Sequence, residues 1–102
     1  MKFKVDRDTL LEGIQTVQNV IITKASLPIL SNILIESHQD KLRLTATDLD
    51  IGITCVIPVD MQEAGAITIP AKRFSDIIKE LPSGDVAVST KKNNQINIET
   101  EF

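Results

Sequence analysis

The feature that most constrains the fold of this chain is a strand–helix pattern that occurs twice. When the sequence is shifted by 64 positions, apolar residues of two segments coincide: Phe3, Val5, Leu10, Ile14 and Val17 meet Ile67, Ile69, Phe74, Ile78 and Leu81. Such an offset is typical of two copies of one supersecondary unit. We therefore expect an α+β fold in a single domain over residues 1–102, with a β-α-β-β-β unit at about 1–60 and a second at about 61–102 that stops one strand short.

The individual elements follow from the period of the apolar residues and from the turn residues between them. The pattern predicts strands at 1–5, 28–37, 42–47, 51–57, 66–69, 85–90 and 95–102, and helices at 6–21 and 70–81. Residues 62–65, "QEAG", are expected to form a loop.

Two details of the helices can be read from the residues themselves. Asp6, Asp8 or a capping box from Thr9 to Glu12 can cap the first helix, and the sequence leaves this choice open. Gly13 weakens that helix slightly and marks a close contact. In the second helix, which Pro70 opens, the core stripe is expected at i, i+3, i+4 and i+7: Phe74, Ile77, Ile78 and Leu81.

The stretch "LTATDLDIGI" places Asp48 and Asp50 between two apolar runs. A pair of carboxylates at this spacing can hold a metal ion or perform acid–base chemistry, but their neighbours supply few of the oxygens that a hard cation needs. The apolar positions also change from even (42, 44, 46) to odd (51, 53, 55, 57) across this stretch. A turn or a bulge must therefore separate the two runs, and we interpret the aspartates as turn residues.

No other group of residues in the sequence is spaced for catalysis or for binding a cofactor. His38 is the only histidine and lies in a polar segment, and Cys55 lies on the apolar face of a strand without a companion ligand or base. The four glycines stand apart, so there is no phosphate-binding loop. We expect no catalytic residue, no metal site and no cofactor.

Cysteine content and hydropathy indicate the compartment. A single cysteine allows no internal disulfide, which fits a reducing cytoplasm. The N-terminus lacks the apolar region of a signal peptide, and no apolar run is long enough to span a membrane. We therefore expect a cytoplasmic protein without a membrane partner.

The charge balance does not by itself indicate nucleic acid, because the formal net charge is −3 with 14 acidic and 11 basic residues. Basic residues nevertheless lie on the polar faces of the two helices: Arg7 on the first, with Lys24 just after it, and Lys72, Arg73 and Lys79 on the second. The competing interpretation is an ordinary solvated face.

Four segments resemble the N-terminal domain of the bacterial sliding-clamp family, the beta subunit of DNA polymerase III: "MKFKVDRDTLLEGI", "LPILSNILIE", "LTATDLDIGI" and "GAITIPAKRFSDIIKELPSG". The resemblance covers the whole chain. It implies the DNA-clamp fold, with two β-α-β-β-β units packed side by side and helices on one face of antiparallel sheet. It also implies a non-catalytic processivity factor, in which two three-domain subunits close head-to-tail into a ring around duplex DNA.

The resemblance also implies roles for individual residues. Lys24 and Lys72 are the expected phosphate contacts, and Arg73 and Ile77 the expected subunit-interface positions. Ile77 thus has two interpretations, core stripe or interface. The polymerase and the clamp loader are expected to bind later domains of the family, outside this chain.

The size of the domain also implies a larger assembly. A domain about 34 Å across must be joined by about four others to surround a duplex roughly 20 Å wide. The chain alone should therefore be a monomer that binds DNA weakly. The alternative functions are a stand-alone α+β module that binds another protein through a sheet edge, and a small metal-dependent enzyme at Asp48 and Asp50.

Overall fold

The computed structural model describes residues 1–18, 32–47, 51–93 and 95–100. In chain order its elements are β1 (Lys2–Asp6), α1 (Arg7–Gln18), β2 (Asn32–His38), β3 (Lys41–Thr47), β4 (Gly52–Pro58), β5 (Asp60–Glu63), β6 (Ala66–Pro70), α2 (Ala71–Glu80), β7 (Asp85–Thr90) and β8 (Ile96–Thr100). None of the helices in these ranges is long and apolar enough to cross a membrane.

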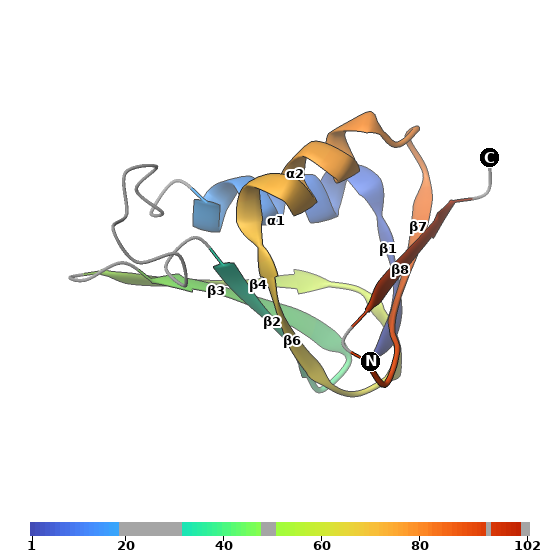
Figure 1. The fold of residues 1–102 in the computed structure, drawn as a ribbon, viewed down its shortest axis with the longest axis horizontal. Coiled ribbons are helices and arrows are strands. Elements are labelled where there is room, and N and C mark those ends of the chain that lie inside the picture. The colour runs from blue at the N-terminus through green and yellow to red at the C-terminus, as the bar shows by residue number, and fades with distance from the viewer. Residues whose placement is uncertain (19–31, 48–50, 94, 101–102) are drawn as a thin grey trace.

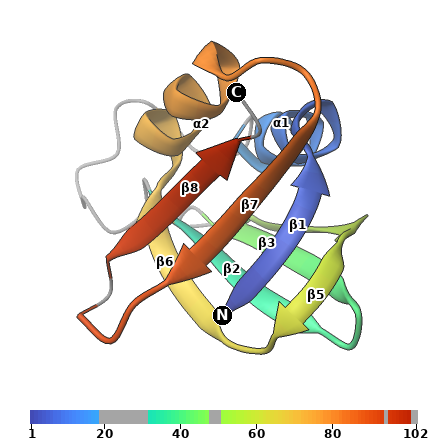
Figure 2. The same cartoon turned by 90° about the vertical axis from the view of Figure 1, so that its right-hand side faces the viewer.

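The strands form two four-stranded antiparallel sheets, which we call sheet A (β5-β1-β7-β8) and sheet B (β4-β3-β2-β6). The sheets meet at an angle near the N-terminus, and the two helices lie next to each other across the open side of that angle (Figures 1 and 2). The apolar core fills the space between the three layers. The predicted α+β class is confirmed, with the strands divided between two sheets.

The strand–helix repeat is visible in the structure, and its two copies interlock. β1 and β6 lie 64 residues apart at both ends, and α1 and α2 begin 64 residues apart, at Arg7 and Ala71. Yet β1 pairs with β7 and β6 pairs with β2, so the first strand of each copy completes the sheet of the other copy. This exchange explains why the two copies share one core.

The expectation of a loop at 62–65 is wrong for its first two residues, because Gln62 and Glu63 belong to β5. The chain leaves sheet B at Pro58, passes Val59 and enters sheet A as β5, where Met61 lies opposite Phe3 of β1. Polar side chains on this short edge strand hide its signal from a hydrophobic pattern.

The hairpin of β3 and β4 explains the change from even to odd apolar positions. Its register runs without interruption from Lys41↔Pro58 to Thr47↔Gly52. In this register Leu44 faces Cys55, so even residues of one strand share a face with odd residues of the other. The change from even to odd positions therefore follows from the pairing of the two strands, and no bulge interrupts either strand within this register. Asp48 and Asp50, the proposed turn residues, lie outside the described residues.

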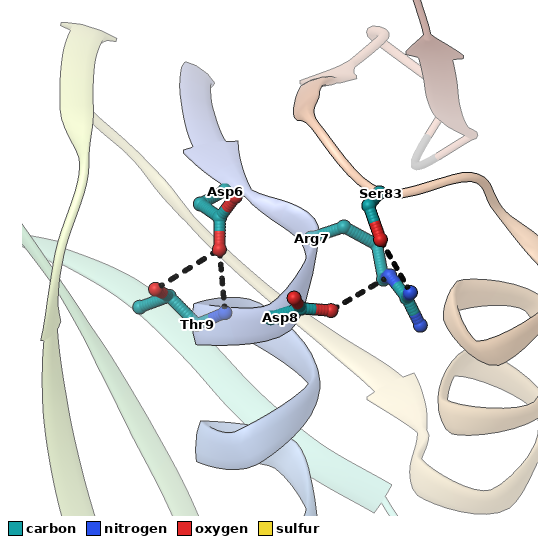
Figure 3. A network of polar contacts seen from close by, with 5 residues as sticks. All are labelled: Asp6, Arg7, Asp8, Thr9 and Ser83. Carbon is teal, nitrogen blue, oxygen red and sulfur yellow. Dashed lines mark hydrogen bonds and ion pairs between the residues drawn. The ribbon is translucent and has the colours of Figure 1, made fainter.

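The capping choice at α1 is resolved by two hydrogen bonds that Thr9 donates to Asp6 Oδ2, from its backbone N–H at 3.2 Å and from its hydroxyl at 3.4 Å (Figure 3). Asp6 therefore caps the helix, which lets it follow β1 without an intervening loop. Ile21 and the predicted strand start near Pro28 lie outside the described residues.

The core stripe of α1 matches the pattern, since Leu10, Ile14 and Val17 are fully buried. The stripe of α2 matches in part: Phe74 and Ile78 are buried and Leu81 packs against the core, but the other buried residues of the helix are Ala71 and Ser75. Ile77 is 41% exposed, so its interpretation as a core residue is wrong. At about 100° per residue, Ile77 lies about 100° around the helix from Ile78, outside the stripe.

Candidate nucleic-acid interface

The first turn of α2 carries two exposed cations, Lys72 and Arg73, and no acidic residue. The helix starts directly after β6, because Pro70 at the N-cap has the extended conformation (φ −62°, ψ 123°) and no N–H to leave unpaired. A helix N-terminus carries partial positive charge, so cations there cost a few tenths of a kcal/mol. Their position is unfavourable for the helix itself and favourable for attracting an anion.

The exposed residues of α2 divide into two flanks on either side of its core stripe. At about 100° per residue, Lys72, Asp76 and Lys79 fall on one flank and Arg73, Ile77 and Glu80 on the other. Neither Lys72, Arg73 nor Lys79 makes an ion pair with a described residue. The structure therefore separates the expected phosphate contact, Lys72, from the two expected interface residues.

Lys79 shares the flank of Lys72 and was not among the predicted site residues. It lies seven residues from Lys72, which is two helical turns, and this spacing is the signal that could have identified it. Asp76 lies between the two lysines and reduces the positive charge of the flank.

Helix α1 contributes less positive charge than its sequence indicates, because Arg7 is held within the fold (Figure 3). Its Nη2 donates to Ser83 Oγ at 3.0 Å, and its Nε lies 3.0 Å from Asp8 Oδ1. The Arg7 backbone N–H also donates to the Gly84 carbonyl at 2.9 Å. These contacts tie the start of α1 to the loop after α2. Because the Arg7 side chain is only 19% exposed, we exclude it from the candidate phosphate contacts.

The other expected phosphate contact, Lys24, lies outside the described residues, so the structure does not bring it together with Lys72. The remaining described residues of α1 that are exposed include Asp8 and Glu12 but no lysine. Within the described parts of the helices, the candidate interface is thus the Lys72–Lys79 flank of α2.

The described residues offer no competing chemical site. No group of three histidine, cysteine or acidic side chains among them is placed to hold a metal ion. Cys55 is half-buried against the core, and His38 is exposed at the end of β2. Two shallow hollows of about 310 and 360 Å³ lie at the ends and edges of the sheets, away from the exposed flanks of α2.

One ion pair on sheet B, between Arg43 and Glu36, shifts the pKa of both residues. Arg43 Nε donates to Glu36 Oε1 at 2.8 Å across β2 and β3. This hydrogen bond holds the pKa of the Glu36 carboxyl below its ordinary value, against a smaller opposing effect of desolvation. The pair crosslinks neighbouring strands of the outer face and takes no part in the α2 surface.

Two interlocked strand–helix repeats, joined into two sheets that support an exposed basic helix flank, define an α+β domain built from a duplicated unit. Residues 1–101 match the family described as DNA polymerase III beta subunit, N-terminal domain. The chain belongs to this family.

Relatives and solved structures agree with this assignment. A "Beta sliding clamp" of Chlamydia muridarum is 38% identical over 98 residues, which are 96% of this chain and 27% of that protein. The pol III beta structure of Caulobacter crescentus is 36% identical with a TM-score of 0.89, covering 97% of this chain and 27% of that one. The DNA polymerase beta subunit of Streptococcus pyogenes is 29% identical with a TM-score of 0.93, covering 98% and 28%. The chain spans about a quarter of the length of each of these three proteins.

Proposed function

We propose that this chain is the N-terminal domain of a DNA sliding clamp, the cytoplasmic, non-catalytic processivity factor of the replicative DNA polymerase. The single observation that carries the proposal is the match over residues 1–101 to the beta-subunit family. In the intact protein, further domains complete a head-to-tail homodimeric ring around duplex DNA and bind the polymerase and the clamp loader. A stand-alone protein-binding module is not favoured, because the clamp of Chlamydia muridarum is about four times longer than the part that matches.

Contact with DNA is proposed for Lys72, together with Lys24. A ring that slides needs weak contacts to phosphates and none to bases, so a few cations suffice despite the acidic balance of the chain. The support for Lys72 is its exposure, its lack of an ion pair with a described residue and its place in the first turn of α2. Lys79 on the same flank is a weaker third contact.

The test is the salt dependence of DNA binding by the intact protein. Each lysine that touches a phosphate adds about 0.9 to the slope of log K against log salt concentration. We expect Lys72→Ala to lower the slope by about 1 and Lys72→Arg to keep it. Lys41→Ala, which removes an exposed lysine from sheet B, is the matched control. An unchanged slope in Lys72→Ala would remove this residue from the interface.

A subunit contact is proposed for Arg73 and Ile77 on the opposite flank of α2. Ile77 is a large aliphatic side chain that remains 41% exposed in the single chain, beside a cation and Glu80. An apolar residue flanked by charges of both signs suits the centre of a protein–protein contact better than the surface of DNA.

Dimerisation of the intact protein tests this contact. Ile77→Ser should raise the dissociation constant of the dimer about fivefold to tenfold, since the aliphatic area it buries on association is worth about 1 kcal/mol. Lys79→Ser, on the other flank, should leave it unchanged. Equal dissociation constants for Ile77→Ser and the unmodified protein, measured by analytical ultracentrifugation, would exclude Ile77 from the interface.

A further inference from the structure

The exposed face of the two helices carries two carboxylates that no described contact of the fold uses. Glu12 of α1 and Asp76 of α2 are both exposed, and neither side chain makes an ion pair or a hydrogen bond with a described residue. Asp8 also lies on this side of α1, but it pairs with Arg7. The helices lie next to each other and bury their apolar sides in the core, so Glu12 and Asp76 lie on the solvent side of the helix layer (Figures 1 and 2).

The strand–helix repeat places these two carboxylates at equivalent positions. α1 and α2 begin 64 residues apart, and Glu12 and Asp76 are separated by the same offset. The basic charges of α2 are not repeated in α1, because Lys72 corresponds to Asp8 and Lys79 corresponds to an uncharged glutamine. Across the described parts of both helices, a carboxylate at this position is thus the charge that the two copies share.

Helical geometry brings Asp76 close to any phosphate that approaches the lysines of α2. At about 100° per residue, Asp76 lies about 40° around the helix from Lys72 and about 60° from Lys79. Side chains three or four residues apart are neighbours, so a phosphate bound to either lysine would come within about 7 Å of the carboxylate. In water, the repulsion of two unit charges at about 7 Å weakens binding about threefold.

Helix α1 adds a second repulsive charge without a lysine to compensate it. Its exposed described residues include Asp8 and Glu12 but no lysine or arginine. A duplex that lies along both helices would therefore be attracted at the lysines of α2 and repelled at a carboxylate of each helix.

We propose that Glu12 and Asp76 limit the affinity of the helix layer for duplex DNA and thereby allow the duplex to slide past it. The inference rests on the proposed function, in which this surface faces DNA. Sliding requires each lysine to leave one phosphate and reach the next, and strong attraction at each phosphate slows this step. A carboxylate beside the lysines weakens the attraction at every phosphate without creating a preference for any base. The lysines thus provide attraction, and the two carboxylates determine how freely the protein moves along DNA.

Substitutions that remove the charge and keep the size of the side chain test this role in the intact protein. We expect Glu12→Gln and Asp76→Asn each to raise the affinity for a short linear duplex about threefold at low salt, and the double variant to raise it about tenfold. Single-molecule tracking on DNA should show diffusion of the double variant slowed by about the same factor. Both effects should shrink as the salt concentration rises, because exposed charges are screened.

Glu63→Gln is the matched control. It removes the same charge from an exposed position at the end of β5, away from the helices (Figure 2). This variant should change neither affinity nor diffusion, and all the variants should unfold at the same temperature as the unmodified protein. Unchanged affinity and diffusion in the double variant would overturn the proposal, as would an equal increase in affinity in Glu63→Gln.

Lys72→Ala, measured in the same titration, separates this inference from the proposed DNA contact. If Lys72→Ala lowers the salt slope while the double variant behaves like the unmodified protein, the contact stands and this inference alone fails. If Lys72→Ala leaves the slope unchanged, the contact and this inference are both overturned.

Discussion

At the scale of the residue, three short contacts explain how the helices are fixed to the sheets. Asp6 caps α1, Arg7 joins its first turn to Ser83, and Gly13 allows the helix to approach sheet B. A Cβ atom at Gly13 would lie 2.9 Å from Leu44 Cδ1 and 3.0 Å from Ile57 Cγ2. The close contact expected from the sequence is therefore confirmed, and its partners are strands β3 and β4.

We expect Gly13→Ala to destabilise the domain in spite of the better helix propensity of alanine. The propensity gain is about 1 kcal/mol, and overpacking of a buried contact costs about 1–3 kcal/mol, so the net loss should be about 1 kcal/mol. Urea unfolding measures the difference, with Gln15→Ala on the exposed face of α1 as the control. A more stable Gly13→Ala would show that Leu44 and Ile57 can move aside at little cost.

At the scale of the element, α2 shows how a tertiary contact overrides an apolar pattern. Ser75 is 1% exposed, and its Oγ has no hydrogen-bond partner in the described structure, while the more apolar Ile77 faces outward. A buried hydroxyl without a partner costs about 1–3 kcal/mol. The orientation of α2 is therefore determined by Phe74 and Ile78 in the core and not by every apolar residue of the helix.

Ser75→Ala should stabilise the domain by about 1 kcal/mol, because it removes the unpaired hydroxyl and improves helix propensity. Thermal unfolding should show a higher midpoint. Ser83→Ala is the matched control: its hydroxyl accepts a hydrogen bond from Arg7, so this variant should be no more stable than the unmodified protein. A lower midpoint for Ser75→Ala would mean that the hydroxyl has a partner in solution.

Some features of the two helices at the candidate site follow from the sequence, and others depend on how the helices pack. The two helices, their basic residues and the exposed Lys72 could be predicted, because amphipathic periodicity and charge are local properties. The separation of α2 into a Lys72 flank and an Ile77 flank could not, because it depends on which side of the helix the core occupies. The removal of Arg7 from the site depends on Ser83, 76 residues away.

At the scale of the whole molecule, the dimensions of the domain limit what it does alone. Its radius of gyration is 12.9 Å and its extents are 37 × 26 × 25 Å, close to the expected size. Such a body cannot surround a duplex roughly 20 Å wide. A single domain of this size can face only part of the circumference of a duplex.

We therefore expect the 102-residue chain, produced by itself, to be a monomer with weak DNA binding. Light scattering at micromolar concentration should give a mass near 11.2 kDa. Titration of duplex DNA at physiological salt should give a dissociation constant no tighter than about 10⁻⁴ M, the weak end of non-specific binding. A stable closed oligomer of the isolated chain would contradict this expectation.

The sequence by itself determined the strand–helix repeat, the start of each helix to within one residue (6 and 70 expected, 7 and 71 observed), and the family, because these depend on local periodicity and on motifs that are contiguous in the chain. Only the tertiary structure decided that β1 and β6 exchange sheets, that polar β5 is a strand, and that Ile77 faces outward while Ser75 is buried. These features arise from pairing and packing between residues far apart in the chain. Their energies depend on the partner that each residue meets, which a local pattern does not contain.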